Sequence, residues 1–178
     1  VEEFLHRFDY TDFTTTKYEK TLHGTAGTLI NNLDFFGKED GFLIHADNFC
    51  RLNLQNIIDS HLKRPKKCLL TMVTFNCANP LECGIVELDD ENVVNNYYEK
   101  SKLNKGNLAN GAIYIFSPEF IEILKNDFND ATDFVMDILP HFLNKIYTYH
   151  SNDIFYDIGN LETLKYVNDL KLEIKSFF

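Results

Sequence analysis

The chain contains no tryptophan, no internal repeat and no low-complexity linker, and sixteen Phe and nine Tyr supply the bulky side chains instead. It also lacks an apolar run of about 18 residues and a secretory signal peptide, so we predict neither a membrane span nor export. At 178 residues it fits one domain, which we place at residues 1–178. A chain of this length can bury roughly 70% of its unfolded surface, enough for a core.

The chain has fewer basic than acidic residues. Lys and Arg number 17 against 27 Asp and Glu, which gives a formal charge of −10, and the densest basic run is confined to residues 63–67. Such a surface would repel a phosphate polymer, so we expect no binding to nucleic acid. A small phosphorylated ligand, held with a metal in one local pocket, remains compatible with this charge.

Cysteines at metal-binding spacing are missing too. None of the four forms a C-x-x-C pair, and no His stands at zinc-finger spacing from Cys50, Cys68, Cys77 or Cys83. Three of them lie in or beside apolar, strand-like stretches, which favours buried reduced thiols. That state suits a cytosolic protein, so we expect a cytoplasmic location.

Helical and strand patterns alternate along the chain, which indicates an α/β fold with a largely parallel sheet. We expect helices over residues 2–8, 25–36, 54–62, from 117 onward, 134–142 and 160–170. We expect strands over residues 13–19, 42–44, 68–75, 84–88, 93–98, 112–116, 145–149 and 154–156.

Two aspartates directly follow apolar strands. Asp47 comes after residues 42–44, and Asp157 comes after residues 154–156. Ligands of open α/β sheets bind outside the carboxyl ends of the strands, so both carboxylates can face one crevice. Mg²⁺ prefers oxygen ligands and needs more than one carboxylate to be held firmly. We therefore predict an Asp47–Asp157 metal pair; the alternative is that each aspartate caps its own loop.

Other polar or small residues are weaker candidates by themselves. Gly24 and Thr25 stand at a strand-to-helix turn, where free N–H groups can meet an acceptor or anion, or they form a plain tight turn. His45 is either a metal ligand or a hydrogen-bonded structural histidine. Glu99 can accept hydrogen bonds from sugar hydroxyls and Lys100 can neutralise a phosphate, or the two form a solvated pair.

Asn110 offers a donor and an acceptor where an apolar strand begins, although any loop-to-strand join can look the same. The order of these short blocks is more telling than any one of them. The chain resembles the sugar-1-phosphate nucleotidyltransferase family from about Tyr18 to Leu170, and most of all the mannose-1-phosphate and heptose-1-phosphate guanylyltransferases. The family blocks L-G-T-A-G, G-D, Y-G-x-V, E-K-P, N-A-G-I-Y and D-I-G-T-P-E have counterparts at residues 22–27, 46–48, 84–86, 99–100, 110–114 and 156–162.

The resemblance implies a Rossmann-like mixed, mostly parallel sheet flanked by helices. It implies transfer of a nucleotidyl group from a nucleoside triphosphate, with GTP favoured, to mannose or manno-heptose 1-phosphate, with Mg²⁺ as cofactor and pyrophosphate as second product. The residue roles it implies are a nucleobase contact for Gly24, substrate binding for Thr25, Mg²⁺ ligation by Asp47 and Asp157, sugar contacts for Gly84, Glu99 and Asn110, and a sugar-phosphate contact for Lys100.

The chain departs from the family pattern at its start, because the Gly-rich loop with an Arg, followed later by Pro-Lys, is absent. We therefore expect an N-terminally incomplete domain, and whether this chain alone is active stays open, as does a homo-oligomer. Two other functions also stay open. One is a non-catalytic nucleotide-sugar-binding or regulatory domain; the other is a glycosyltransferase, although residues 46–48 lack its usual Asp-x-Asp motif.

Overall fold

A computed structural model of the chain describes residues 1–102 and 105–170. The α-helices are α1 (Glu2–Arg7), α2 (Gly24–Ile30), α3 (Leu54–Leu62), α4 (Pro118–Asp127) and α5 (Leu161–Asp169). The strands are β1 (Gly41–Ile44), β2 (Asn48–Cys50), β3 (Leu70–Asn76), β4 (Gly84–Leu88), β5 (Val94–Glu99), β6 (Leu108–Phe116), β7 (Ile146–His150) and β8 (Phe155–Asp157). Single turns of tighter or wider helix are η1 (Thr11–Phe13), η2 (Leu33–Phe36), η3 (Pro80–Glu82), η4 (Phe134–Ile138, a π-helix) and η5 (Leu139–Phe142).

Three of the α-helices begin at a side chain that caps them. Asn53, Ser117 and Asn160 each accept a hydrogen bond from the backbone N–H three residues later. Such a cap contributes about 1 kcal/mol to stability, and Pro118 adds a preset φ at the first position of α4. The helix starts expected at residues 117 and 160 are thereby confirmed. None of the helices in the described ranges is both long and apolar enough to cross a membrane.

The central sheet has the strand order β5-β4-β6-β3-β7, and β1 also pairs with β6. The β3–β7 ladder is parallel, whereas β6 runs antiparallel to β1, β3 and β4, and β4–β5 is an antiparallel hairpin. Strands β1, β3, β4 and β7 thus share one direction. The expected α/β fold class with a mixed sheet is confirmed. The expectation of mostly parallel pairing is corrected, because β6 lies between β1 and β3 and opposes both.

A bulge divides β6 into two halves. The first half pairs with β3 and β4, and the second half pairs with β3 and β1. At the junction, residues 111–113 of β6 lie opposite the single residue Val73 of β3. Ala112 has a left-handed φ of 50°, and a Cβ on Gly111 would lie 3.0 Å from Val73 O and 3.1 Å from the Phe155 ring. The bulge therefore depends on a small residue at position 111.

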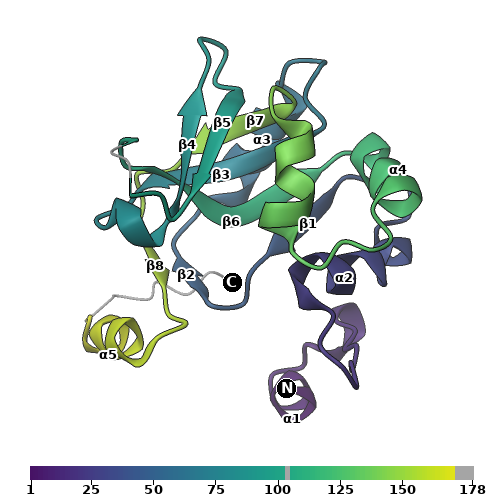
Figure 1. Ribbon diagram of the computed structural model, residues 1–178. Coiled ribbons are helices and arrows are strands. Elements are labelled where there is room, and N and C mark those ends of the chain that lie inside the picture. The colour runs from purple at the N-terminus through teal and green to yellow at the C-terminus, as the bar shows by residue number, and fades with distance from the viewer. Residues whose placement is uncertain (103–104, 171–178) are drawn as a thin grey trace.

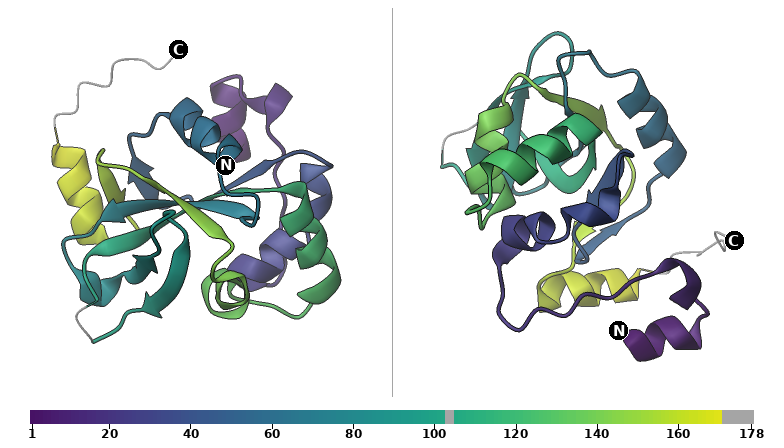
Figure 2. Two further views of the ribbon diagram at one scale, coloured as in Figure 1. Left: turned by 90° about the horizontal axis from the view of Figure 1, so that it is seen from above. Right: turned by 90° about the vertical axis from the view of Figure 1, so that its right-hand side faces the viewer.

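Alternation along β6 supplies two cores. Tyr114 and Phe116 are fully buried on the face covered by α2, α4 and η4, whereas Ile113 and Ile115 pack with Ile57 of α3 on the other face. Figure 2 shows α3 on one side of the sheet and α2 and α4 on the other. The result is the three-layer arrangement expected for the α/β class.

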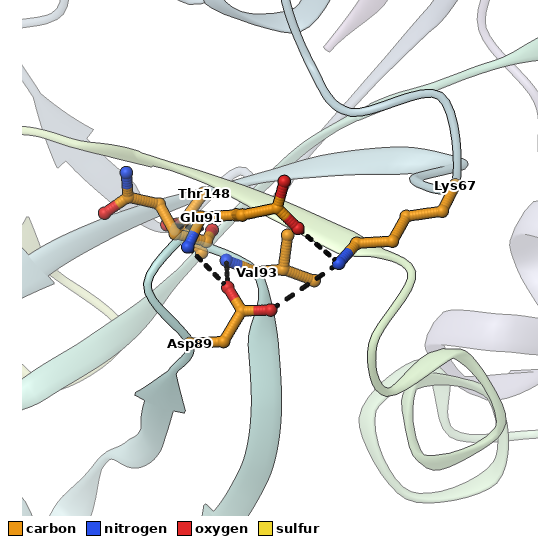
Figure 3. Close-up of polar contacts among 6 residues, drawn as sticks. Lys67, Asp89, Glu91, Val93 and Thr148 are labelled. Atoms are coloured by element: carbon orange, nitrogen blue, oxygen red, sulfur yellow. Dashed lines mark hydrogen bonds and ion pairs between the residues drawn. The ribbon is translucent and has the colours of Figure 1, made fainter.

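The β4–β5 hairpin is anchored at its turn. Asp89 Oδ1 accepts the backbone N–H groups of Glu91 and Val93, each at 2.9 Å, and these bonds keep the pKa of Asp89 below its usual value. Lys67 Nζ lies 2.7 Å from Glu91 Oε2 and 3.6 Å from Asp89 Oδ2 (Figure 3). The turn of the hairpin also contacts β7, because Thr148 N donates to Asn92 O at 3.0 Å. The hairpin is therefore fixed to the sheet beyond its own ladder.

Two expected helices differ in the structure. The helix expected over residues 25–36 is α2 followed by η2, with a break at Asn31 and Asn32, both poor interior helix residues. The helix expected over residues 134–142 is a π-helix followed by a 3₁₀ turn. Pro140 in that turn cannot donate a helical hydrogen bond, so an α-helix does not continue through it.

The strand expected over residues 13–19 is wrong. Residues 14–23 pair with no strand in the described part of the chain, and Thr and Tyr content alone does not make a strand without a partner. The preceding α1 has no buried residue, and its Phe4 and Phe8 rings contact each other in a tilted arrangement, with centroids 4.6 Å apart. Figure 1 shows α1 below the sheet and apart from it.

All four cysteines are free thiols, as expected. Cys68 and Cys77 are buried, and Cys50 and Cys83 are partly buried. Burial raises the pKa of Cys50, Cys68 and Cys83, so these three thiols are protonated near neutral pH. A cytoplasmic location stays a prediction that these free thiols suit.

Candidate active site

The backbone brings Asp47 and Asp157 to one place. Strands β2 and β8 pair antiparallel with Asn48 opposite Asp157, and Ile158 N donates to Asp47 O at 2.8 Å. A Cβ built on Gly159 would lie 2.9 Å from Asp157 Oδ1 and 3.2 Å from Asp47 Oδ2. Both carboxylates therefore face the small space left open by Gly159, and both side chains are exposed to solvent.

One local and one long-range hydrogen bond hold the acidic pair and the ribbon that carries it. Gly159 N donates to Asp157 Oδ1 at 2.8 Å, which orients that carboxylate. Asn48 Nδ2 donates to Gly111 O at 2.9 Å, and this bond ties the β2–β8 ribbon to the bulge of β6. The position of the pair thus depends on two segments about a hundred residues apart in the chain, joined at a short ribbon (Figure 1).

Two nearby carboxylates fit a hard cation that keeps most of its own water. Mg²⁺ is commonly bound by one or two carboxylates together with substrate phosphate oxygens. Within residues 1–102 and 105–170, no three His, Cys, Asp or Glu side chains gather as a metal-binding group. His45 therefore does not join Asp47 and Asp157 as a third protein ligand. The donor set suits Mg²⁺ and does not suit a structural zinc.

A second polar cluster lies at the open end of the hairpin. Gly84 on β4 stands opposite Glu99 on β5. The Tyr97 hydroxyl donates to Glu99 Oε2 at 2.7 Å, and a Cβ on Gly84 would collide with that hydroxyl. Lys100, with a left-handed φ of 44°, ends the strand and places its Nζ 4.0 Å from Glu99 Oε1. Gly84, Glu99 and Lys100 are therefore brought together.

Asn110 joins this cluster from β6. Its Nδ2 donates to the buried Tyr114 hydroxyl at 2.7 Å, and its Oδ1 accepts from Ala112 N at 2.9 Å. Burial, and next the Glu99 carboxylate, raise the pKa of Tyr97, while burial raises that of Tyr114. Both tyrosines therefore stay neutral at ordinary pH, and Asn110 is held by its bonds to Tyr114 and Ala112.

The two clusters adjoin each other. Asn110 precedes Gly111, whose carbonyl binds the ribbon that carries Asp47 and Asp157. The charge of Asp157 contributes to the raised pKa of the Cys83 thiol, and Cys83 directly precedes Gly84. The acidic pair and the Glu99–Lys100 cluster thus border the bulge of β6 from two sides.

Gly24 and Thr25 begin α2. Gly24 has a left-handed φ of 75°, and a Cβ there would collide with the carbonyl of Thr132. The Thr25 hydroxyl accepts from Phe134 N at 2.9 Å. Both residues therefore fasten α2 to residues 132–134, and Figure 1 shows α2 on the α4 side of the sheet. The structure therefore groups Asp47 with Asp157, and Gly84 with Glu99 and Lys100. It holds Gly24 and Thr25 against residues 132–134.

Reasoning from the sequence missed Tyr97 and Gly159 as site residues. Tyr97 lies two residues before Glu99 and so shares its face of β5, which is the signal that was available. Gly159 follows Asp157 by two residues, a spacing at which a backbone N–H can bind an aspartate oxygen.

Two exposed carboxylates are groups that can hold a divalent cation, and a carboxylate with a lysine and an amide are groups that can bind an anionic, hydroxylated ligand. The family comparison agrees. A family model described as "Nucleotidyl transferase" matches residues 6–173, and the chain belongs to this family.

The curated relatives are similar over part of their length. The glucose-1-phosphate adenylyltransferase of Mycoplasma mobile is 26% identical over 155 residues, which are 82% of this chain and 41% of the relative. That of Clostridium acetobutylicum is 28% identical over 151 residues, which are 79% of this chain and 40% of the relative. The chain thus spans about two fifths of the length of these relatives.

Solved structures share the fold. HddC from Yersinia pseudotuberculosis, complexed with GMP-PN, matches with a TM-score of 0.70 and 22% identity over 92% of this chain and 72% of that one. A Bacillus anthracis protein described as a candidate glucose-1-phosphate thymidylyltransferase, in complex with a sucrose, matches with a TM-score of 0.81 and 16% identity over 98% and 72%. The fold is therefore that of the sugar-1-phosphate nucleotidyltransferases.

Proposed function

We propose that the protein to which this chain belongs transfers a nucleotidyl group from a nucleoside triphosphate to a sugar 1-phosphate and releases pyrophosphate. The observation that carries this proposal is the meeting of Asp47 and Asp157 around Gly159 in a chain of the nucleotidyl transferase family. Both substrates are anions, so a site for them has to hold positive charge between two phosphorylated groups.

The residues divide this work. Asp47 and Asp157 would hold Mg²⁺, which when bound supplies positive charge to the reacting phosphates. Lys100, exposed at the end of β5, would hold the phosphate of the sugar. Glu99 would accept hydrogen bonds from sugar hydroxyls. Catalysis would come mainly from positioning and from preorganised charge.

The nucleotide and the sugar have two candidate pairs. GTP with mannose or manno-heptose 1-phosphate follows from the sequence blocks, and HddC was crystallised with GMP-PN. ATP with glucose 1-phosphate follows from the names of the curated relatives, which are adenylyltransferases. Pyrophosphate release with each nucleotide and each sugar 1-phosphate distinguishes the two pairs.

A non-catalytic nucleotide-sugar-binding domain is the second candidate function. It is favoured by the fact that Gly24 and Thr25, the proposed nucleobase and substrate contacts, already contact residues 132–134: Gly24 lies against Thr132 and the Thr25 hydroxyl accepts from Phe134 N. Such a domain would bind a nucleotide-sugar without releasing pyrophosphate.

The deciding experiment measures pyrophosphate release in the full-length protein with GTP, ATP and dTTP against mannose, heptose and glucose 1-phosphates. We expect one pair to react and Asp47→Asn to remove that turnover. Asp90→Asn, which changes an exposed carboxylate at the tip of the hairpin, is the matched control and should react like the wild type. Nucleotide-sugar binding with no turnover for any pair would support the second function instead.

A further inference from the structure

We propose that Tyr97 is a positioning residue for the sugar site: its hydroxyl holds Oε2 of Glu99 and so leaves Oε1 to accept a hydrogen bond from a ligand hydroxyl. The bond from Tyr97 to Glu99 Oε2 measures 2.7 Å. The inference rests on the proposed function for the identity of the ligand, a sugar 1-phosphate. It adds that the two oxygens of the Glu99 carboxylate have different partners: Oε2 binds Tyr97, and Oε1 binds the ligand.

Strand geometry gives Tyr97 this place. Residues two apart on a strand share a face, so Tyr97 and Glu99 lie on one face of β5 and Tyr98 lies on the other. The Tyr98 hydroxyl donates to Glu87 Oε2 at 3.0 Å, away from the Glu99 cluster. The same hairpin therefore carries two tyrosine–glutamate bonds on opposite faces, only one of which borders the proposed site.

Gly84 provides the space for this arrangement. It stands directly opposite Glu99 in the β4–β5 ladder. A Cβ at that position would collide with the Tyr97 hydroxyl and would lie 2.8 Å from Glu99 Oε2. The role of Gly84 in the sugar site is therefore to admit the tyrosine hydroxyl, and any larger residue would displace the Tyr97–Glu99 bond.

Asn110 lies on a second side of the Tyr97 hydroxyl. Asn110 lies close enough to Tyr97 to lower its pKa, and the Asn110 side chain is itself held by a 2.7 Å bond to the Tyr114 hydroxyl. Because burial and the Glu99 carboxylate keep the pKa of Tyr97 far above neutrality, its hydroxyl remains a donor. Two bonded pairs thus neighbour each other: Asn110 with the core residue Tyr114, and Tyr97 with Glu99 at the proposed sugar site.

The remaining oxygen is well placed for a ligand. Glu99 Oε1 lies 4.0 Å from Lys100 Nζ, the group proposed to bind the sugar phosphate. An ionised carboxylate only accepts hydrogen bonds, so Oε1 selects a hydroxyl at a fixed distance from the phosphate. A sugar 1-phosphate that lacks this hydroxyl should lose the contact.

The test compares Tyr97→Phe with Tyr98→Phe in the full-length protein, because each variant removes one hydroxyl bonded to one glutamate. For Tyr97→Phe, we expect KM for the sugar 1-phosphate to rise about tenfold while KM for the nucleoside triphosphate stays unchanged, the size expected for a lost bond to a charged group. Tyr98→Phe should leave both constants unchanged. Equal constants in wild type and Tyr97→Phe would overturn the inference.

A double-mutant cycle separates positioning from a general structural role. If Tyr97 acts through Glu99, then Tyr97→Phe should change KM for the sugar 1-phosphate much less in a Glu99→Ala background than in the wild type. An equal tenfold effect in both backgrounds would show that Tyr97 acts otherwise. A wild-type protein that releases no pyrophosphate with any substrate pair would instead overturn the proposed function, and this inference with it.

Discussion

Replacing Gly159 by alanine is expected to damage the acidic pair without damaging the fold. The new Cβ would lie 2.9 Å from Asp157 Oδ1 and 3.2 Å from Asp47 Oδ2. An ordinary van der Waals contact is about 3.5 Å, so the two oxygens must retreat by about 0.6 and 0.3 Å. A misplacement of about 1 Å can cost about a hundredfold in rate, so we expect a loss of about tenfold here.

The loss should appear as a weaker dependence on metal. Gly159 is exposed and its φ lies outside the left-handed region, so alanine fits the backbone and thermal unfolding should change little. We would measure pyrophosphate release as a function of Mg²⁺ concentration and expect the half-saturating concentration to rise about tenfold. An unchanged Mg²⁺ dependence in the folded variant would refute the reasoning, since the added methyl cannot avoid both carboxylates.

Three other outcomes follow from single residues. Ala112→Gly should raise the free energy of unfolding by roughly 0.5–1 kcal/mol, measured by urea denaturation, because glycine relieves the left-handed strain at a smaller entropic cost. Burial, and next the charge of Arg64, lower the pKa of His61 to about 4, so the unfolded chain takes up the proton first. Stability should therefore fall as pH drops from about 6.5 towards 4, and thermal unfolding of His61→Gln should show a smaller fall. Lys100→Ala should raise KM for the sugar 1-phosphate about tenfold in initial-rate kinetics, and an unchanged KM would exclude its contact.

Local sequence signals predicted most of the elements. The helix starts at residues 117 and 160, the helix over residues 54–62 and the strand pair at residues 84–88 and 93–98 each depend on neighbours within a few positions, and the structure confirms them. The expected strand over residues 13–19 fails for the opposite reason. A strand needs a partner, and the identity of the partner is not a local property of the sequence.

The sequence predicted those site residues whose positions follow from the order of the strands. Placing Asp47 and Asp157 after two apolar runs was enough to expect one crevice, and the two carboxylates do meet. The three-residue β2–β8 ladder that joins them was not foreseeable, since it pairs segments about a hundred residues apart over a very short length. The direction of the Asn110 side chain was equally hidden, because it depends on the bulge of β6.

The most direct test of the central claim is Mn²⁺ binding, followed by electron paramagnetic resonance, in the wild type and in Asp47→Asn, Asp157→Asn and Asp90→Asn. Mn²⁺ serves as the probe because it also takes oxygen ligands. If Asp47 and Asp157 hold one ion, each substitution should weaken binding by about tenfold or more, which corresponds to about 1.4 kcal/mol, and Asp90→Asn should not. Wild-type affinity in either of the first two variants would contradict a shared metal site.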